Sequence, residues 1–150
     1  MTKVLIVEDN EHKRGKIMSL LLEEFPLMDV SEAYSFTSGC QAIDSCFYDL
    51  VLMDMSLPTH DKSPTDSGGR FRAFGGREIA RKVIRRGLAT RLLFITQYDS
   101  FSDKVKSLTL ATLADELERE CGANYFGVVH YDSSKSAWRE QLNAKLSALT

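Results

Sequence analysis

The chain has 150 residues and a formal net charge of -2 at neutral pH. This length favours one domain with a single hydrophobic core, and a hydrophobic content of 43% is typical of a globular protein. The small negative charge provides no basic field for nucleic-acid binding. No run is long enough to span a membrane, and no long apolar leader stands at the N-terminus. We therefore expect a cytoplasmic protein with neither nucleic acid nor membrane as a partner.

The three cysteines are too few and too irregularly spaced for a disulfide framework or a CxxC metal site: they are Cys40, Cys46 and Cys121. All three fall in stretches with helical character. We interpret them as reduced core residues.

The N-terminal half begins with a short apolar run over residues 3–7, which predicts a buried strand. A helix is expected over about residues 10–25, with one apolar face formed by Ile17, Met18, Leu21 and Phe25. It ends before Pro26, which cannot continue it. A short strand, a weaker helix and a further apolar strand follow, at residues 30–33, 35–46 and 50–54.

The C-terminal half opens with the least regular segment, residues 59–76, where five Gly and Pro residues are scattered among polar ones. We expect a long, mobile inserted loop there. The remaining segments read in turn as helix, strand, long helix, strand and helix: residues 77–86, 91–96, 103–121, 126–130 and 136–149. Gly122 is the natural stop of the long helix.

Strands and helices thus alternate five times along the chain, which is the pattern of a parallel, doubly wound sheet. In such a sheet the functional site lies at the carboxyl ends of the strands. We expect one domain over residues 1–150, enlarged by the loop at about 59–76 and by the long helix at about 103–121.

Two of the predicted strands end in carboxylates. The run over residues 50–53 has no polar alternation, as expected of a strand covered on both faces, and it leads into Asp54. The first strand ends directly in Glu8 and Asp9. If the two strands are neighbours, the three side chains converge into a pocket that no local cation neutralises. Such a cluster is costly unless it holds a metal, and a set of oxygen ligands suits magnesium.

The order of these features resembles the receiver domain of two-component response regulators. The matching pieces are Val-Glu-Asp at residues 7–9, Tyr-Asp-Leu-Val-Leu-Met-Asp-Met-Ser-Leu-Pro at 48–58, Phe-Ile-Thr at 94–96 and Gly-Ala at 122–123. Each piece alone is weak, but their order and spacing together are specific. The resemblance spans the chain apart from its two enlarged regions.

The resemblance implies that Asp54 accepts a phosphoryl group from the phosphohistidine of a partner kinase. It assigns Mg²⁺ to Glu8, Asp9, Asp54 and the backbone carbonyl of Ser56, in agreement with the charge argument. Thr96 would then bond a phosphoryl oxygen and draw its loop inward.

The chain departs from the family pattern at the end of the fifth strand. A lysine that contacts the phosphoryl group is usual there, but the matching residue is His130. A neighbouring lysine could substitute from a loop; Lys62, Lys104 and Lys135 are the candidates. Gln97 follows the switch threonine, where the family usually has a small residue, and its bulk would restrict donor access. Tyr98 would shield an acyl phosphate from water.

These observations predict a flavodoxin-like fold with five parallel strands in the order 2-1-3-4-5. The leading functional hypothesis is a single-domain response regulator that uses Mg²⁺, is phosphorylated by a sensor histidine kinase or phosphotransfer protein, and signals by docking a partner protein or by self-association. It would be no enzyme beyond self-phosphorylation and self-dephosphorylation. The alternative is a pseudo-receiver that binds proteins without phosphotransfer. A hydrolase is a weak third hypothesis, because Ser56 stands where a second aspartate would be needed.

Overall fold

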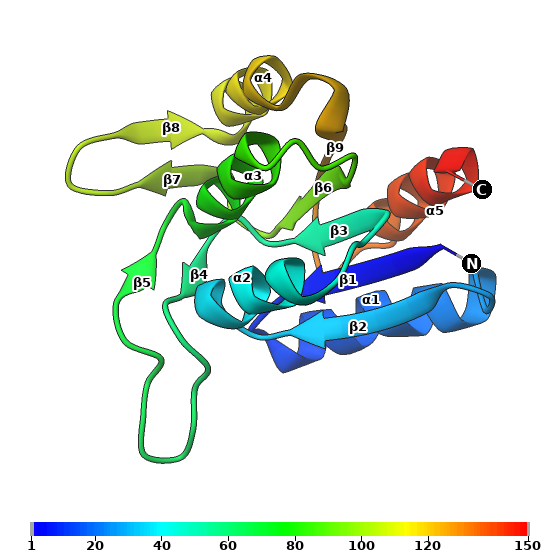
Figure 1. The fold of residues 1–150 in the computed structure, drawn as a ribbon, viewed down its shortest axis with the longest axis horizontal. Coiled ribbons are helices and arrows are strands. Elements are labelled where there is room, and N and C mark those ends of the chain that lie inside the picture. Colours follow the sequence, from blue (N-terminus) through cyan, green and yellow to red (C-terminus); the bar gives the residue numbers. More distant parts are fainter. Residues whose placement is uncertain (1, 150) are drawn as a thin grey trace.

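A computed structural model describes residues 2–149 (Figure 1). Its core is a five-stranded parallel sheet in the order β2-β1-β3-β6-β9. The strands are β1 (Lys3–Val7), β2 (Asp29–Ala33), β3 (Leu50–Met53), β6 (Arg91–Thr96) and β9 (Tyr125–His130). Numbered among the sheet strands alone, this order is 2-1-3-4-5, so the predicted topology is confirmed.

Helices cover both faces of the sheet (Figure 1). On one face, α1 (Glu11–Glu24) and α5 (Ala137–Leu149) pack against one set of strand side chains. On the other face, α2 (Phe36–Ser45), α3 (Gly75–Arg85) and α4 (Leu110–Cys121) pack against the alternate set. Both faces of β3 are buried, as its unbroken apolar sequence requires. The predicted doubly wound architecture is therefore confirmed.

Helix α1 begins where its sequence provides a cap. The side chain of Asn10 accepts a hydrogen bond of 2.9 Å from the backbone N–H of Lys13, which satisfies one of the free donors in the first turn. The helix ends at Glu24, before Pro26. This register turns Lys13, Ile17, Leu20 and Leu21 toward the sheet. Met18 and Phe25, expected on the same face, are only partly buried.

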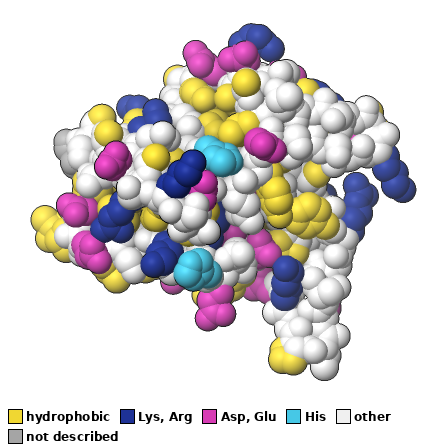
Figure 2. Space-filling model, turned by 180° about the vertical axis from the view of Figure 1, so that it is seen from behind, with side chains coloured by type: hydrophobic (Ala, Val, Ile, Leu, Met, Phe, Trp, Pro, Cys, Tyr) yellow, Lys and Arg dark blue, Asp and Glu magenta, His cyan; other side chains and the backbone are white. Residues whose placement is uncertain are grey.

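Two short strands, one just before the inserted segment and one within it, organise its path. Strand β4 (Leu57–Pro58) pairs antiparallel with β5 (Phe71–Arg72), and α3 takes up residues 75–76 from the expected loop. The carboxylate of Asp61 accepts hydrogen bonds from the hydroxyls of Ser35 (2.6 Å) and Ser38 (2.8 Å) at the start of α2. The segment projects from the body of the molecule (Figure 2). Instead of a structureless loop, the insertion is a hairpin tied to α2.

The long helix predicted over residues 103–121 is wrong at its N-terminal end. Residues 100–109 form an antiparallel pair, β7 (Ser100–Ser102) and β8 (Ser107–Thr109), and α4 begins only at Leu110. The hairpin turn is closed by Asp103, whose carboxylate accepts hydrogen bonds from two backbone N–H groups. Thr109 then caps α4. A short 3-10 helix (Gly122–Asn124) follows α4. Across residues 2–149, no helix is long and apolar enough to cross a bilayer.

Candidate functional site

Three carboxylates converge at the carboxyl edge of the sheet. Glu8 and Asp9 follow β1, and Asp54 follows the neighbouring parallel strand β3. One carboxylate oxygen from each residue lies within 4.8 Å of the other two. The predicted convergence is confirmed. Three clustered carboxylates offer the hard oxygen ligands that magnesium prefers, so this donor set fits the ion.

Asp54 is almost fully buried, with 3% of its surface exposed. Its Oδ1 accepts a 2.7 Å hydrogen bond from the backbone N–H of Met55, and its Oδ2 lies 3.2 Å from the Nζ of Lys13. Burial raises the pKa of Asp54, and the nearby Lys13 ammonium opposes this effect. The side chain is therefore held in one orientation by a backbone donor on one oxygen and a cation on the other.

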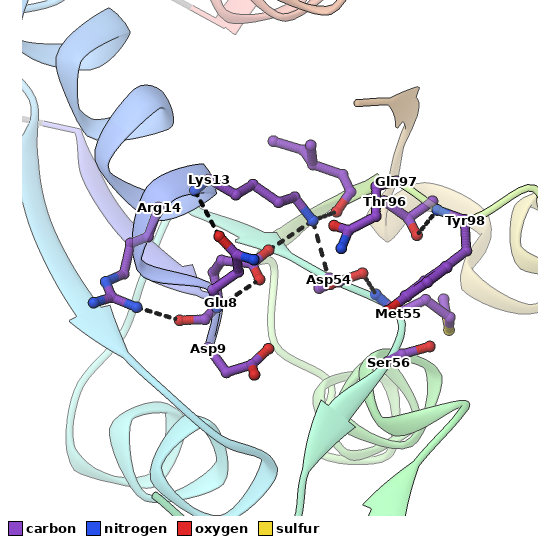
Figure 3. Close-up of polar contacts among 12 residues, drawn as sticks. Glu8, Asp9, Lys13, Arg14, Asp54, Met55, Ser56, Thr96, Gln97 and Tyr98 are labelled. Atoms are coloured by element: carbon purple, nitrogen blue, oxygen red, sulfur yellow. Dashed lines mark hydrogen bonds and ion pairs between the residues drawn. The ribbon is translucent and has the colours of Figure 1, made fainter. Parts of the chain in front are cut away.

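Lys13 neutralises part of the acidic pocket, which corrects the prediction that no local cation does so. Its ammonium lies 2.7 Å from Oε1 of Glu8 and 3.2 Å from Oδ2 of Asp54, and it donates a 2.7 Å hydrogen bond to the carbonyl of Ile95. Figure 3 shows the side chain extending from α1 to both carboxylates. In that view Asp9 lies on the side of Glu8 and Asp54 that faces away from Lys13.

The sequence does contain a signal for Lys13. Residues 13, 17, 20 and 21 share one face of α1, and all four are buried. A lysine on a core-facing stripe is rarely fully buried unless it is paired. The sequence-based prediction used only the apolar members of this face and gave no position for Lys13.

Glu8 is almost fully buried, with 1% of its surface exposed. The pKa of Glu8 is raised from the ordinary 4.5 to about 7. Burial is the main cause, the ammonium of Lys13 opposes it, and the charge of Asp54 adds to it. Its Oε2 accepts a 3.1 Å hydrogen bond from the backbone N–H of Asn10. One oxygen of Glu8 thus accepts a backbone hydrogen bond, and the other contacts the Lys13 ammonium as an ion pair.

Asp9 is the most accessible of the three acids, and its partner comes from the insertion. The Nζ of Lys62 lies 2.9 Å from Oδ2 of Asp9. The Lys62 side chain is 56% exposed, compared with 2% for that of Lys13. Lys62 therefore contacts a predicted metal ligand. Lys104 lies between β7 and β8, and Lys135 lies just before α5.

The remaining predicted residues surround this pocket. Thr96 is buried at the end of β6, and its Oγ1 accepts a 3.2 Å hydrogen bond from the backbone N–H of Tyr98. His130 is exposed beside it in the sheet register, with Nε2 3.2 Å from the carbonyl oxygen of Gln97. Gln97 is exposed and Tyr98 is 44% exposed. The switch, phosphoryl-contact and access roles of these residues stay predictions.

Ser56 is buried beside the pocket, and its hydroxyl donates a 2.9 Å hydrogen bond to the carbonyl of Ala73. Its backbone carbonyl is the predicted metal ligand, and that role stays a prediction too. Gly76, at the start of α3, donates its N–H to the carbonyl of Met55 at 2.8 Å. The segment after Asp54 is therefore fastened to both the insertion and α3.

Sequence comparisons relate the whole chain to response regulators. It is 28% identical over 149 residues to the Detocs response regulatory protein DtcB of Enterobacter cloacae, covering 98% of this chain and 99% of that protein. It is 29% identical to the uncharacterized protein y4jR of Sinorhizobium fredii, with 97% of each chain covered. Response regulator ArlR of Staphylococcus saprophyticus shares 34% identity over 108 residues, which are 72% of this chain and 41% of that protein. No protein-family model matches the chain.

Solved structures of response regulators have the same fold as this chain. Response regulator TrrA from Thermotoga maritima, in complex with Mg²⁺-BeF, superposes with a TM-score of 0.66 at 18% identity and full coverage of both chains. The chemotaxis response regulator CheY4 of Vibrio cholerae gives a TM-score of 0.64 at 17% identity, covering 100% of this chain and 99% of that one. At these identities the structures show the fold. Together, the sequence similarity and the fold identify the chain as a receiver domain of the response-regulator type.

Proposed function

We propose that this receiver domain is a phosphoacceptor, in which Asp54 takes a phosphoryl group from a sensor histidine kinase or phosphotransfer protein with the help of Mg²⁺. The observation that carries the proposal is the convergence of Glu8, Asp9 and Asp54 at the carboxyl edge of the sheet. A carboxylate nucleophile next to two further acids is the arrangement expected for metal-assisted phosphoryl transfer.

In this reaction a carboxylate oxygen of Asp54 attacks phosphorus while the bond from phosphorus to the donor's imidazole nitrogen breaks. The product is an acyl phosphate on Asp54. Magnesium, held by Asp9 and Asp54 with Glu8 beside them and the Ser56 carbonyl as a further ligand, would offset the charge on the phosphoryl oxygens. The Met55 N–H orients the attacking carboxylate.

The partners follow from the same reaction. A histidine kinase or phosphotransfer protein must bring its phosphohistidine to the carboxyl edge of the sheet, where Asp54 lies. The output would be passed to a separate protein, or through self-association, after phosphorylation changes the loops at that edge. We place the reaction in the cytoplasm, where kinases have access to ATP.

Intact mass spectrometry tests the proposal directly. Incubation with acetyl phosphate and Mg²⁺ should add one phosphate to the wild-type protein and none to Asp54→Asn. A Mg²⁺ titration followed by NMR should give an affinity in the roughly millimolar range, weakened about tenfold or more in Asp9→Ala. The sole tryptophan, Trp138, packs on Tyr131 near Lys13, so its fluorescence is a second readout. A phosphate adduct that survives in Asp54→Asn would contradict the assignment of the nucleophile.

A pseudo-receiver that binds proteins without phosphotransfer is the second candidate, and a specific observation favours it. The pocket has its own cations, Lys13 and Lys62, so three ionised carboxylates retain a single net negative charge. Retention of the acids therefore does not by itself require a metal. A protein that binds no Mg²⁺ and takes up no phosphate from acetyl phosphate would support this candidate.

A further inference from the structure

We propose that Lys13, delivered from helix α1, is the fixed cation that contacts the phosphoryl group on Asp54. This inference rests on the proposed phosphoacceptor function and names a residue that acts at the same site. It is carried by the contacts of a buried ammonium with the nucleophile itself, from an element that the sequence resemblance did not implicate.

The Lys13 ammonium has three oxygen neighbours: it donates a hydrogen bond to one and forms ion pairs with the other two. Two contacts are short, at 2.7 Å to Glu8 and 2.7 Å to the carbonyl of Ile95, and the third, to Oδ2 of Asp54, is 3.2 Å. The two short contacts hold the ammonium in place, while the longest contact is the one to the nucleophile. A phosphoryl oxygen on Asp54 could therefore replace the carboxylate in this longest contact and accept a hydrogen bond from the ammonium with the least rearrangement.

The opposite side of the pocket supports this assignment. The strand that should provide the cation, β9, ends in His130, whose exposed ring lies against the carbonyl of Gln97. The next residue, Tyr131, is buried and presents its ring 5.8 Å from the ammonium of Lys13. The end of β9 thus contributes an aromatic wall beside a cation that arrives from α1.

The hydrogen bond from Lys13 to the Ile95 carbonyl also connects Asp54 to the end of β6. Ile95 immediately precedes Thr96 at the end of β6, so the ammonium joins the nucleophile to the backbone of the predicted switch segment. When a phosphoryl oxygen accepts a hydrogen bond from the ammonium, the ammonium shifts. Its hydrogen bond to the Ile95 carbonyl and the position of Thr96 then change together. Lys13 therefore links occupancy of Asp54 to the end of β6.

Binding of beryllofluoride, a phosphoryl mimic, tests the proposal without relying on turnover. We expect Lys13→Met to weaken beryllofluoride binding at saturating Mg²⁺ by roughly ten- to a hundredfold, as measured by ¹⁹F NMR, because a charge-assisted hydrogen bond is lost. Binding of Mg²⁺ alone should be retained or strengthened, because a competing cation is gone. Lys16→Met, the same change at an exposed position of α1, is the matched control and should match the wild type.

A relocation variant covers the case in which Lys13→Met does not fold. The double variant Lys13→Met/His130→Lys returns a lysine to the pocket from the end of β9, and it should fold and recover beryllofluoride binding. Wild-type-like beryllofluoride binding by Lys13→Met would overturn the proposed role of Lys13 but not the phosphoacceptor function. A folded double variant that does not bind beryllofluoride would have the same consequence. Failure of the wild-type protein to bind beryllofluoride or take up phosphate would overturn the proposed function as well.

Discussion

Lys62 in the insertion forms an ion pair of 2.9 Å with Asp9, the most accessible acid of the candidate metal site. The pair connects the hairpin that projects from the body of the molecule to the carboxyl edge of the sheet. A cation that binds Asp9 must compete with this ammonium. The insertion can thus influence metal affinity through a single side chain.

We expect Lys62→Ala to raise the affinity for Mg²⁺ by up to about fivefold, because an exposed ion pair is worth about 0.2–1 kcal/mol. Isothermal titration calorimetry at low ionic strength would measure the change, and added salt should reduce it. Lys106→Ala removes the same charge from another ion pair, with Glu116, and serves as the control. Unchanged or weaker Mg²⁺ binding in Lys62→Ala would mean that the Asp9 contact does not compete with the metal.

The raised pKa of Glu8 predicts how the stability of the metal-free protein depends on pH. Between 4.5 and about 7, the folded protein binds this proton more tightly than the unfolded chain does, so the free energy of unfolding falls as pH rises. The loss in the free energy of unfolding is on the order of 3 kcal/mol for a shift of this size. The pKa of Asp54 is also raised, so its titration changes the free energy of unfolding in the same direction.

Thermal melts in EDTA from pH 5 to pH 8 would measure this effect. In Glu8→Gln the melting temperature should fall less between pH 5 and pH 8, because the substitution removes the titrating group. Mg²⁺ should restore stability most strongly at the high end of the range, where the carboxylates are ionised. A melting temperature that rises steadily with pH in the metal-free wild type would be inconsistent with the raised pKa.

Asp54→Asn should leave the metal-free protein as stable as the wild type or more stable at pH 8. The substitution removes a buried charge that repels Glu8, while the amide oxygen can still accept the hydrogen bond from Lys13. Chemical denaturation at fixed pH would measure the difference in free energy of unfolding. Asp115→Asn, at an exposed position of α4, is the control and should change stability by less than about 0.5 kcal/mol. A large loss in Asp54→Asn would identify the ionised carboxylate as a structural centre.

The fold was predictable from sequence where local pattern and tertiary setting agree. The short apolar run Leu50–Met53 predicts a strand buried on both faces, and Asp54, which follows it, then falls at the sheet edge. Residues 103–109 were wrongly included in the long helix, because β8, the strand that they contain, has only three residues. So short a strand gives too little alternation to outweigh the helical spacing that follows it.

The site was predictable in its acids but not in its cations. Carboxylates that end adjacent parallel strands must converge, whereas the reach of a long side chain depends on the packing of the helix that carries it. Lys13 reaches Asp54 only because α1 places it over the end of β1, and Lys62 reaches Asp9 only because the insertion folds back. Neither relation is local in the sequence.

Gly76 provides the last test, because it packs directly under the candidate phosphoacceptor. A Cβ atom there would fall well inside van der Waals distance of the backbone carbonyl oxygen of Asp54 and against the Cα of Met55. The backbone cannot move aside without displacing Asp54 or the N-terminus of α3. We expect Gly76→Ala to lower the free energy of unfolding by about 1–3 kcal/mol and to weaken beryllofluoride binding.

The matched control is Gly15→Ala, the same substitution inside α1 at a position where a Cβ meets nothing within 4 Å. Alanine has a higher helix propensity than glycine, so this variant should gain about 0.5–1 kcal/mol and bind beryllofluoride like the wild type. Urea unfolding and ¹⁹F NMR on both variants would compare the two positions under the same conditions. If Gly76→Ala also proved stabilising, the close contact between α3 and the Asp54 backbone would not constrain the site, and the orientation of the carboxylate would have to depend on Lys13 and the Met55 N–H alone.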